Sequence, residues 1–205
     1  GFEIGHPGVG SNQNLSNITL DRSYSISGPI SVYGHDIYVN TDQTVMTGSG
    51  RITLKAIGFI VSATGADLRT SGGDIVFWSD ADVSGAGQIR LGATNTMCTG
   101  WNSANTTCSL SGGGDVVMGG GSSDPVDAGL PAGASLGWGS GSANANGVAL
   151  GPCTANSTAS VSNEINTRGG NLILRGASTT ENSGTSAIQA GVAICNGTTI
   201  NLDSG

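Results

Sequence analysis

The sequence is poor in charged and aromatic residues. Only 10% of its 205 residues are charged and 4% are aromatic, whereas charged residues make up about a quarter of an average soluble domain. Lysine occurs once, as Lys55. Coiled coils and long amphipathic helices need abundant Ala, Glu, Lys, Leu and Arg, so this composition excludes an architecture built on them.

Basic residues are scarce relative to acidic ones. Seven Lys and Arg stand against 14 Asp and Glu, which gives a formal net charge of −7. Because a negative chain repels phosphate, we expect no nucleic-acid partner. The sequence also lacks a run of 18 apolar residues, so we expect no membrane-spanning segment.

Glycine, by contrast, is abundant, with 36 residues of 205 against a usual share of about 7%. Hydrophobic residues make up 37% of the chain, and β-branched residues recur in pairs, which argues against disorder. What remains is an all-β chain rich in Gly, Ser, Thr and Asn.

One short phrase recurs: Gly, a polar residue, an apolar one, any residue and a second apolar one. It occupies residues 28–32, 50–54, 73–77, 87–91, 114–118 and 170–174. Other short alternations lie at 18–20, 36–39, 59–61 and 200–202. Alternation places the two apolar residues of each phrase on one face of a strand, and Gly and Asn supply tight corners.

The spacing of these phrases predicts a parallel β-helix. Ile30, Ile52 and Ile75 are 22 and 23 residues apart, which fits one rung of a solenoid whose inward residues form apolar ladders. Later spacings of 14, 27 and 56 residues indicate several strands per rung and insertions between them. An antiparallel sandwich is the alternative fold.

We expect residues 1–205 to form a single β-solenoid segment with two loop excursions, at about 93–112 and 119–151. Long loops on a rigid scaffold often carry function, and otherwise are tolerated decoration. Binding, if the protein binds a ligand, is expected on these excursions.

Four cysteines allow three disulfide pairings, of which we favour Cys98–Cys108 and Cys153–Cys195. The first would close a short polar excursion. Disulfides would imply an oxidising, extracytoplasmic location; the alternative is four buried free thiols. Only two His residues are present, far from the cysteines in sequence, so we expect no zinc site.

Asp80 and Asp82 form a weak calcium candidate. On a strand the two carboxylates would share one face and could hold calcium or act as acid and base. The favoured interpretation is a turn, because no D-x-D-x-D-G loop is present and Asp near strand ends bonds local N–H groups. A Ser-His-Asp triad and a phosphate loop also find no support. We therefore expect no catalytic residues, no enzymatic activity and no cofactor.

The three tryptophans are candidate ligand-contact aromatics, because exposed indole rings can stack on sugars. Alternation places Trp78 with Val76, opposite Ile75 and Phe77, so it should face outward. Trp101 and Trp138 lie in the first and second excursions. The alternative is that each covers a small apolar patch where a loop meets the rod.

Residues 65–82, with Gly72-Gly73-Asp74-Ile75-Val76-Phe77-Trp78 at their centre, resemble a repeat of large bacterial surface adhesins, and so do residues 26–34 and 169–176. They are similar to the filamentous-haemagglutinin-like proteins, which a partner outer-membrane pore exports. The resemblance implies a right-handed parallel β-helix rod, on the cell surface or released, that serves adhesion, aggregation or biofilm matrix. It carries no catalytic residues. The four cysteines depart from that family's pattern.

We therefore expect an extracellular, secreted fibre or adhesin segment. Both ends of the chain have the pattern of strands, so the expected partners are copies of the chain itself or flanking solenoid of a longer chain, with surface glycans as further candidates. Two alternatives stay open. One is a secreted polysaccharide-degrading β-helix enzyme using Asp80, Asp82, Arg90 and Trp78, and the other is a self-stacking filament subunit.

Overall fold

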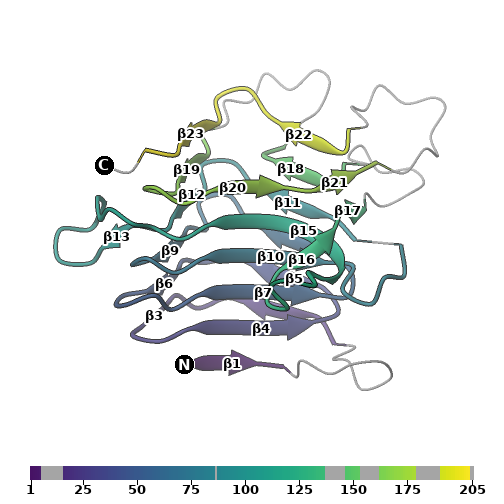
Figure 1. Ribbon diagram of the computed structural model, residues 1–205, viewed down its shortest axis with the longest axis horizontal. Coiled ribbons are helices and arrows are strands. Elements are labelled where there is room, and N and C mark those ends of the chain that lie inside the picture. Colours follow the sequence, from purple (N-terminus) through teal and green to yellow (C-terminus); the bar gives the residue numbers. More distant parts are fainter. Residues whose placement is uncertain (6–15, 86, 137–145, 153–161, 179–189, 204–205) are drawn as a thin grey trace.

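The computed structural model describes residues 1–5, 16–85, 87–136, 146–152, 162–178 and 190–203. These residues form a parallel β-helix of six rungs, each made of three short strands (Figure 1). The prediction of an all-β solenoid is confirmed, and the antiparallel sandwich is excluded because the strands that build the rungs pair in parallel.

Three parallel sheets run along the rod, each receiving one strand from every rung. Sheet A contains β1 (Phe2–Ile4), β4 (Ile30–Gly34), β7 (Ile52–Ala56), β10 (Ile75–Ser79), β15 (Val116–Ser123) and β20 (Leu172–Leu174). Sheet B contains β2 (Ile18–Leu20), β5 (Ile37–Val39), β8 (Ile60–Ser62), β11 (Ile89–Leu91), β18 (Val148–Leu150) and β22 (Val192–Ile194). Sheet C contains β3 (Tyr24–Ile26), β6 (Gln43–Val45), β9 (Leu68–Thr70), β12 (Thr96–Cys98), β19 (Glu164–Asn166) and β23 (Thr199–Asn201).

The core is a set of apolar ladders inside the rod. The first apolar residue of the recurrent phrase stacks in register through successive rungs, as Ile30, Ile52, Ile75, Val116 and Leu172. All but the last are fully buried. Each such side chain stabilises the fold by about 1.5–3 kcal/mol relative to exposure, so the repeated alternation is what holds the rungs together.

The glycine that opens the phrase is required by the close approach of successive rungs. A methyl group at Gly73 would overlap the backbone carbonyl of Gly50, and one at Gly170 would overlap that of Gly114. No side chain fits between these corners, because the rungs are already at hydrogen-bonding separation.

Aspartates at the corners tie each rung to the next. Five carboxylate oxygens each accept a backbone N–H one rung further along: Asp36 from Phe59, Asp42 from Asp67, Asp67 from Thr96, Asp74 from Asp115, and Asp115 from Asn171. The sequence interpretation expected such residues to bond local N–H groups. Their bonds run instead along the rod, where they satisfy donors that the turn leaves unpaired.

The excursions are shorter than the sequence indicated. Residues 93–112 include β12, a strand of sheet C, and only the hairpin of β13 (Trp101–Asn102) and β14 (Thr107–Cys108) leaves the rung. Residues 119–151 include the end of β15 and all of β18. Between them, β16 (Pro131–Gly133) pairs antiparallel with β15, and β17 (Ser135–Leu136) pairs with β21 (Gly176–Ala177). The chain therefore folds back onto the rod.

Candidate functional site

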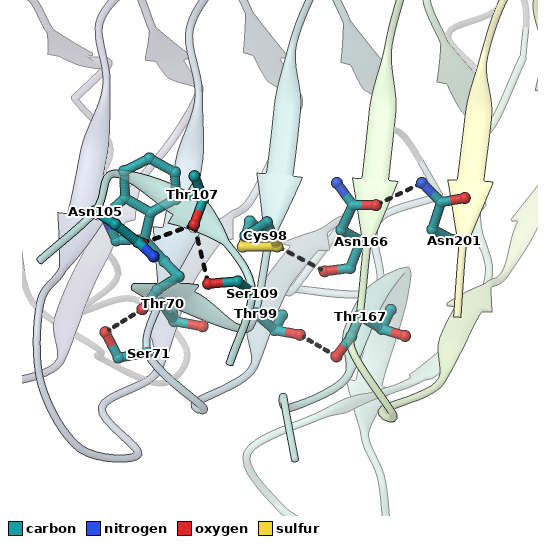
Figure 2. The surroundings of a disulfide bond; sticks show 12 residues. Thr70, Ser71, Cys98, Thr99, Asn105, Thr107, Ser109, Asn166, Thr167 and Asn201 are labelled. Atoms are coloured by element: carbon teal, nitrogen blue, oxygen red, sulfur yellow. Dashed lines mark hydrogen bonds between the residues drawn. A yellow bond between two sulfur atoms is a disulfide. The ribbon is translucent and has the colours of Figure 1, made fainter. Parts of the chain in front are cut away.

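A disulfide-linked hairpin covers part of the outer face of sheet C (Figure 2). Cys98 points outward from β12, because its neighbour Met97 is in the core. It bonds to Cys108 of β14, with a Cα–Cα distance of 5.9 Å. The predicted Cys98–Cys108 pairing is confirmed. Cys195 is also disulfide-bonded, and its predicted partner Cys153 lies outside the described residues.

The base of the hairpin is bonded to the neighbouring rung. The Ser71 hydroxyl donates to the carbonyl oxygen of Trp101 at 2.8 Å, and Ser71 forms a β-bridge with Gly100. The backbone N–H groups of Ser109 and Leu110 both donate to the Gly100 carbonyl at 2.9 Å. The hairpin is therefore held at its base by backbone contacts as well as by the disulfide.

The surface of the hairpin is lined with hydroxyl and amide groups. The Thr107 hydroxyl donates to Asn105 Oδ1 at 2.7 Å and lies 2.9 Å from the Ser109 hydroxyl (Figure 2). Beside them on sheet C, Asn201 Nδ2 donates to Asn166 Oδ1 at 2.7 Å. Asn105, Thr107 and Ser109 are exposed, so they can form hydrogen bonds with a hydroxyl-rich ligand at little cost.

Trp101 lies against a charged cluster on sheet C. The Arg69 guanidinium is 4.7 Å from the Trp101 ring centroid, in cation–π contact. Arg69 also pairs with Asp42, Nη1 to Oδ2, at 2.9 Å, and with Asp67. Burial raises the pKa of Asp67, although the Thr96 N–H and Arg69 oppose that shift. Two carboxylates around one guanidinium make the cluster net acidic, so it suits a neutral, hydroxyl-bearing ligand better than an anion.

Trp78 is not an exposed platform. It faces outward from sheet A, as alternation predicted, but only 3% of it is exposed. Its indole Nε1 donates to the Gly121 carbonyl at 2.7 Å, and it forms a second apolar cluster with Val76 and Val117. The alternative interpretation, an aromatic that covers an apolar patch under a loop, is the one the structure shows. Trp138 lies outside the described residues.

Arg51 anchors the segment that covers Trp78, a role that was not predicted from the sequence. Its Nη1 donates to the Gly129 carbonyl at 3.3 Å, while Nη2 lies 2.7 Å from Asp74 Oδ2 and 3.6 Å from Asp127 Oδ2. Backbone N–H groups of Val126 and Asp127 lower the pKa of Asp124 in the same segment. The only available signal was Arg51 within the recurrent phrase, and it does not reveal a partner 78 residues away.

Asp80 and Asp82 lie in the turn after β10. Asp80 Oδ1 accepts hydrogen bonds from the Gly85 N–H at 3.0 Å and from the Ser84 hydroxyl at 3.3 Å. Asp82 Oδ1 accepts one from the Ser84 N–H at 3.2 Å. Both carboxylates therefore stabilise the turn. In the described ranges no three His, Cys, Asp or Glu side chains gather as a metal site would require.

No protein-family model, curated protein or solved structure matches the chain. Among the described residues, no helix is long and apolar enough to cross a membrane. The features that bear on function are therefore the rod, the hairpin that carries Trp101 and the remaining outer faces of the sheets.

Proposed function

We propose that the chain is a segment of an extracellular β-helical fibre or adhesin that serves attachment, aggregation or biofilm matrix. Two features support this. Backbone ladders continue through six described rungs, and such ladders make a stiff rod. The Cys98–Cys108 disulfide is typical of oxidising compartments outside the cytoplasm. A bacterial adhesin of the filamentous-haemagglutinin type is the family we propose on the resemblance of the repeats.

The hairpin of β13 and β14 is the observation that carries the adhesive role. It places a partly exposed aromatic ring, Trp101, beside Asn and Thr side chains on a disulfide-braced projection. Aromatic faces with nearby amides and hydroxyls suit neutral surface glycans. Bracing matters because a ligand then binds without first ordering the loop.

A filament subunit is a second candidate, favoured by the last described rung. Ile194, Ile200 and Leu202 are 52%, 37% and 47% exposed, although residues at equivalent positions in inner rungs are buried. A further rung stacked on this face would cover them. That rung belongs either to a copy of the chain or to flanking solenoid.

An attachment assay tests the hairpin. Purified protein is coated on beads and incubated with glycan-bearing cells, comparing wild type, Trp101→Ala, and a variant whose residues 102–107 are replaced by Asn-Gly. We expect both variants to lose most attachment while their circular dichroism and elution volume stay unchanged. Val126→Ser is the matched control, since Val126 is exposed on a different loop. Full attachment by the hairpin variants would overturn this assignment.

Two further assays separate the alternatives. Electron microscopy of native material with intact-mass measurement distinguishes fibres of stacked 205-residue subunits from one long continuous chain. Incubation with pectin and alginate tests the enzyme alternative, and release of reducing or unsaturated ends would favour it over the structural proposal.

A further inference from the structure

A second surface, on the opposite side of the rung from the hairpin, gathers aromatic and basic side chains. On sheet A, Tyr33 and Lys55 are neighbours in register and point outward. On sheet B, Tyr38, Val61 and Arg90 form an outward column in register. We call these five residues the corner patch, because the corner between sheets A and B separates its two columns.

The residues of the corner itself continue the patch. His35 and Phe59 lie there, both partly exposed, and the His35 carbonyl accepts the N–H of Gly58 in the next rung at 2.7 Å. Three carboxylates lie at this corner. Asp80 and Asp82 accept hydrogen bonds in the turn between β10 and β11, where Asp82 is exposed, and Asp36 is buried. Its Oδ1 accepts the Phe59 N–H at 3.1 Å and lies 3.2 Å from His35 Nδ1. The Asp36 carboxylate is therefore already bonded within the fold.

Two permanent cations, Lys55 and Arg90, belong to the patch. In the part of the chain that the structure describes, no carboxylate pairs with Lys55 or Arg90. Arg51 and Arg69, by contrast, each contact two carboxylates. Among the described residues, Lys55 and Arg90 are thus open to pairing with an anionic ligand.

Lys55 is in an electrostatically unfavourable position. Its Nζ lies 3.7 Å from the Trp78 ring centroid, which stabilises the ammonium only partly. Burial lowers the pKa of Lys55. An anion bound beside it would supply the missing countercharge and recover part of the desolvation cost.

We propose that the corner patch binds a uronate chain of an acidic polysaccharide. Tyrosine rings offer apolar faces to the C–H faces of sugar rings. A guanidinium binds a carboxylate through two parallel hydrogen bonds, and an ammonium binds it as a point charge. A polymer of uronic acids repeats both features along its length, and the patch carries aromatic groups on one rung and basic groups on the next two.

The small number of cations decides against a nucleic-acid ligand. Tight nucleic-acid binding relies on many phosphate contacts, and the patch supplies two permanent cations. This inference goes beyond the proposed function, because the patch is separate from the hairpin and its ligand is charged. Hairpin variants leave it intact, so each proposal can fail alone.

Affinity electrophoresis in gels containing sodium polygalacturonate tests the proposal, with dextran and dextran sulfate gels alongside. We expect wild type to be retarded by polygalacturonate and not by dextran. Arg90→Gln, Lys55→Gln and Tyr38→Ala should each weaken binding about tenfold, as expected for loss of one charge-assisted or stacking contact. The thermal midpoint of each variant shows whether it remains folded.

Arg22→Gln is the matched control, because Arg22 is exposed outside the patch and its removal changes net charge by the same amount. It should bind like wild type. The proposal is overturned if wild type is not retarded, if Arg22→Gln weakens binding as much as Arg90→Gln, or if dextran sulfate retards the protein as strongly as polygalacturonate.

Discussion

Asp74 Oδ1 accepts a hydrogen bond at 2.9 Å from the backbone N–H of Asp115, the residue that stacks on it in the next rung. The two residues are 41 apart in sequence. Asp115 repeats the arrangement with Asn171. A side chain at each corner thus extends the backbone ladder across a turn where strands cannot continue it.

Removing this link should weaken the rod. Asp74→Ala leaves the Asp115 N–H without its acceptor and Arg51 without its closest carboxylate, so we expect a loss of about 2 kcal/mol in the free energy of unfolding. Asp74→Asn keeps an acceptor oxygen and should cost less. Urea denaturation of both variants checks this order. Equal losses would mean that the ion pair, rather than the cross-rung hydrogen bond, carries the effect.

Gly73→Ala should be among the most damaging single-methyl additions. The new methyl meets the rigid backbone of Gly50, so the two rungs must separate, at a cost of about 3 kcal/mol. Gly48→Ala is the control: its methyl meets no atom within 4 Å, and only its φ of +68° is unfavourable, which costs about 1 kcal/mol. Thermal unfolding compares the two, and similar midpoints would contradict the close-approach argument.

Substitutions at Trp78 and Trp101 should affect different properties, with Trp78→Ala lowering stability and Trp101→Ala lowering attachment. Trp78→Ala removes a buried ring and its bond to Gly121, which should cost about 3–5 kcal/mol and loosen the covering segment. Trp101 is partly exposed, so Trp101→Ala should cost about 1 kcal/mol and act mainly on attachment. Denaturant midpoints with the bead assay measure both effects. A larger stability loss at Trp101 would reverse the two roles.

Replacing both Cys98 and Cys108 by Ala should loosen the hairpin. The disulfide closes a loop with a sequence separation of 10, and losing such a constraint costs about 3 kcal/mol. Hydrogen exchange should quicken at the amides of β13 and β14, while those of β9 in the neighbouring rung keep their protection. Unchanged exchange in the hairpin would show that the Ser71 and Gly100 contacts suffice to hold it.

The shifted pKa of Asp67 makes the stability of the fold depend on pH in a defined direction. Burial raises its pKa above the ordinary value of 3.8, so between these two values the folded state binds more protons than the unfolded state. Asp67 therefore adds stability below pH 3.8, and this contribution is lost as pH rises through the raised pKa. Between about pH 3 and pH 6, the stability of wild type relative to Asp67→Asn should fall. A constant difference across this range would contradict the shift.

Sheet A was predictable because five of its six parallel strands carry the complete phrase. The Gly of the phrase marks the corner before the strand, and the alternation shows which side chains face the core. The 22- and 23-residue spacings place Ile30, Ile52 and Ile75 in one ladder. The spacing of 14 also has a simple origin, since Ile75 and Ile89 begin two strands of the same rung.

Most of sheet C could not be predicted from apolar alternation, because polar residues point inward from it. Gln43 is fully buried and donates to the carbonyls of Arg22 and Thr41. Thr70 is buried too, and its hydroxyl donates to the Gly73 carbonyl. Their hydrogen bonds replace apolar packing, and those partners are known only once the rungs are stacked.

Whether each tryptophan is buried or exposed depends on contacts with residues distant in sequence. Local alternation gave the direction of Trp78 correctly, but its cover comes from Gly121 and Leu130. The corner patch could not be predicted either, since only the register of three successive rungs places Tyr33 and Arg90 in columns on the two sides of one corner.

The stacked glycine corners have a consequence for how the rod grows. Residues Ile30 and Ile52 are one rung apart, and so are Val116 and Leu172, yet the second pair encloses far more chain. Each step nevertheless advances the rod by the same strand spacing of about 4.8 Å. Insertions at the corners therefore change the width and the surface chemistry of the rod while its length stays constant. The length of the rod and its binding surfaces can thus evolve independently.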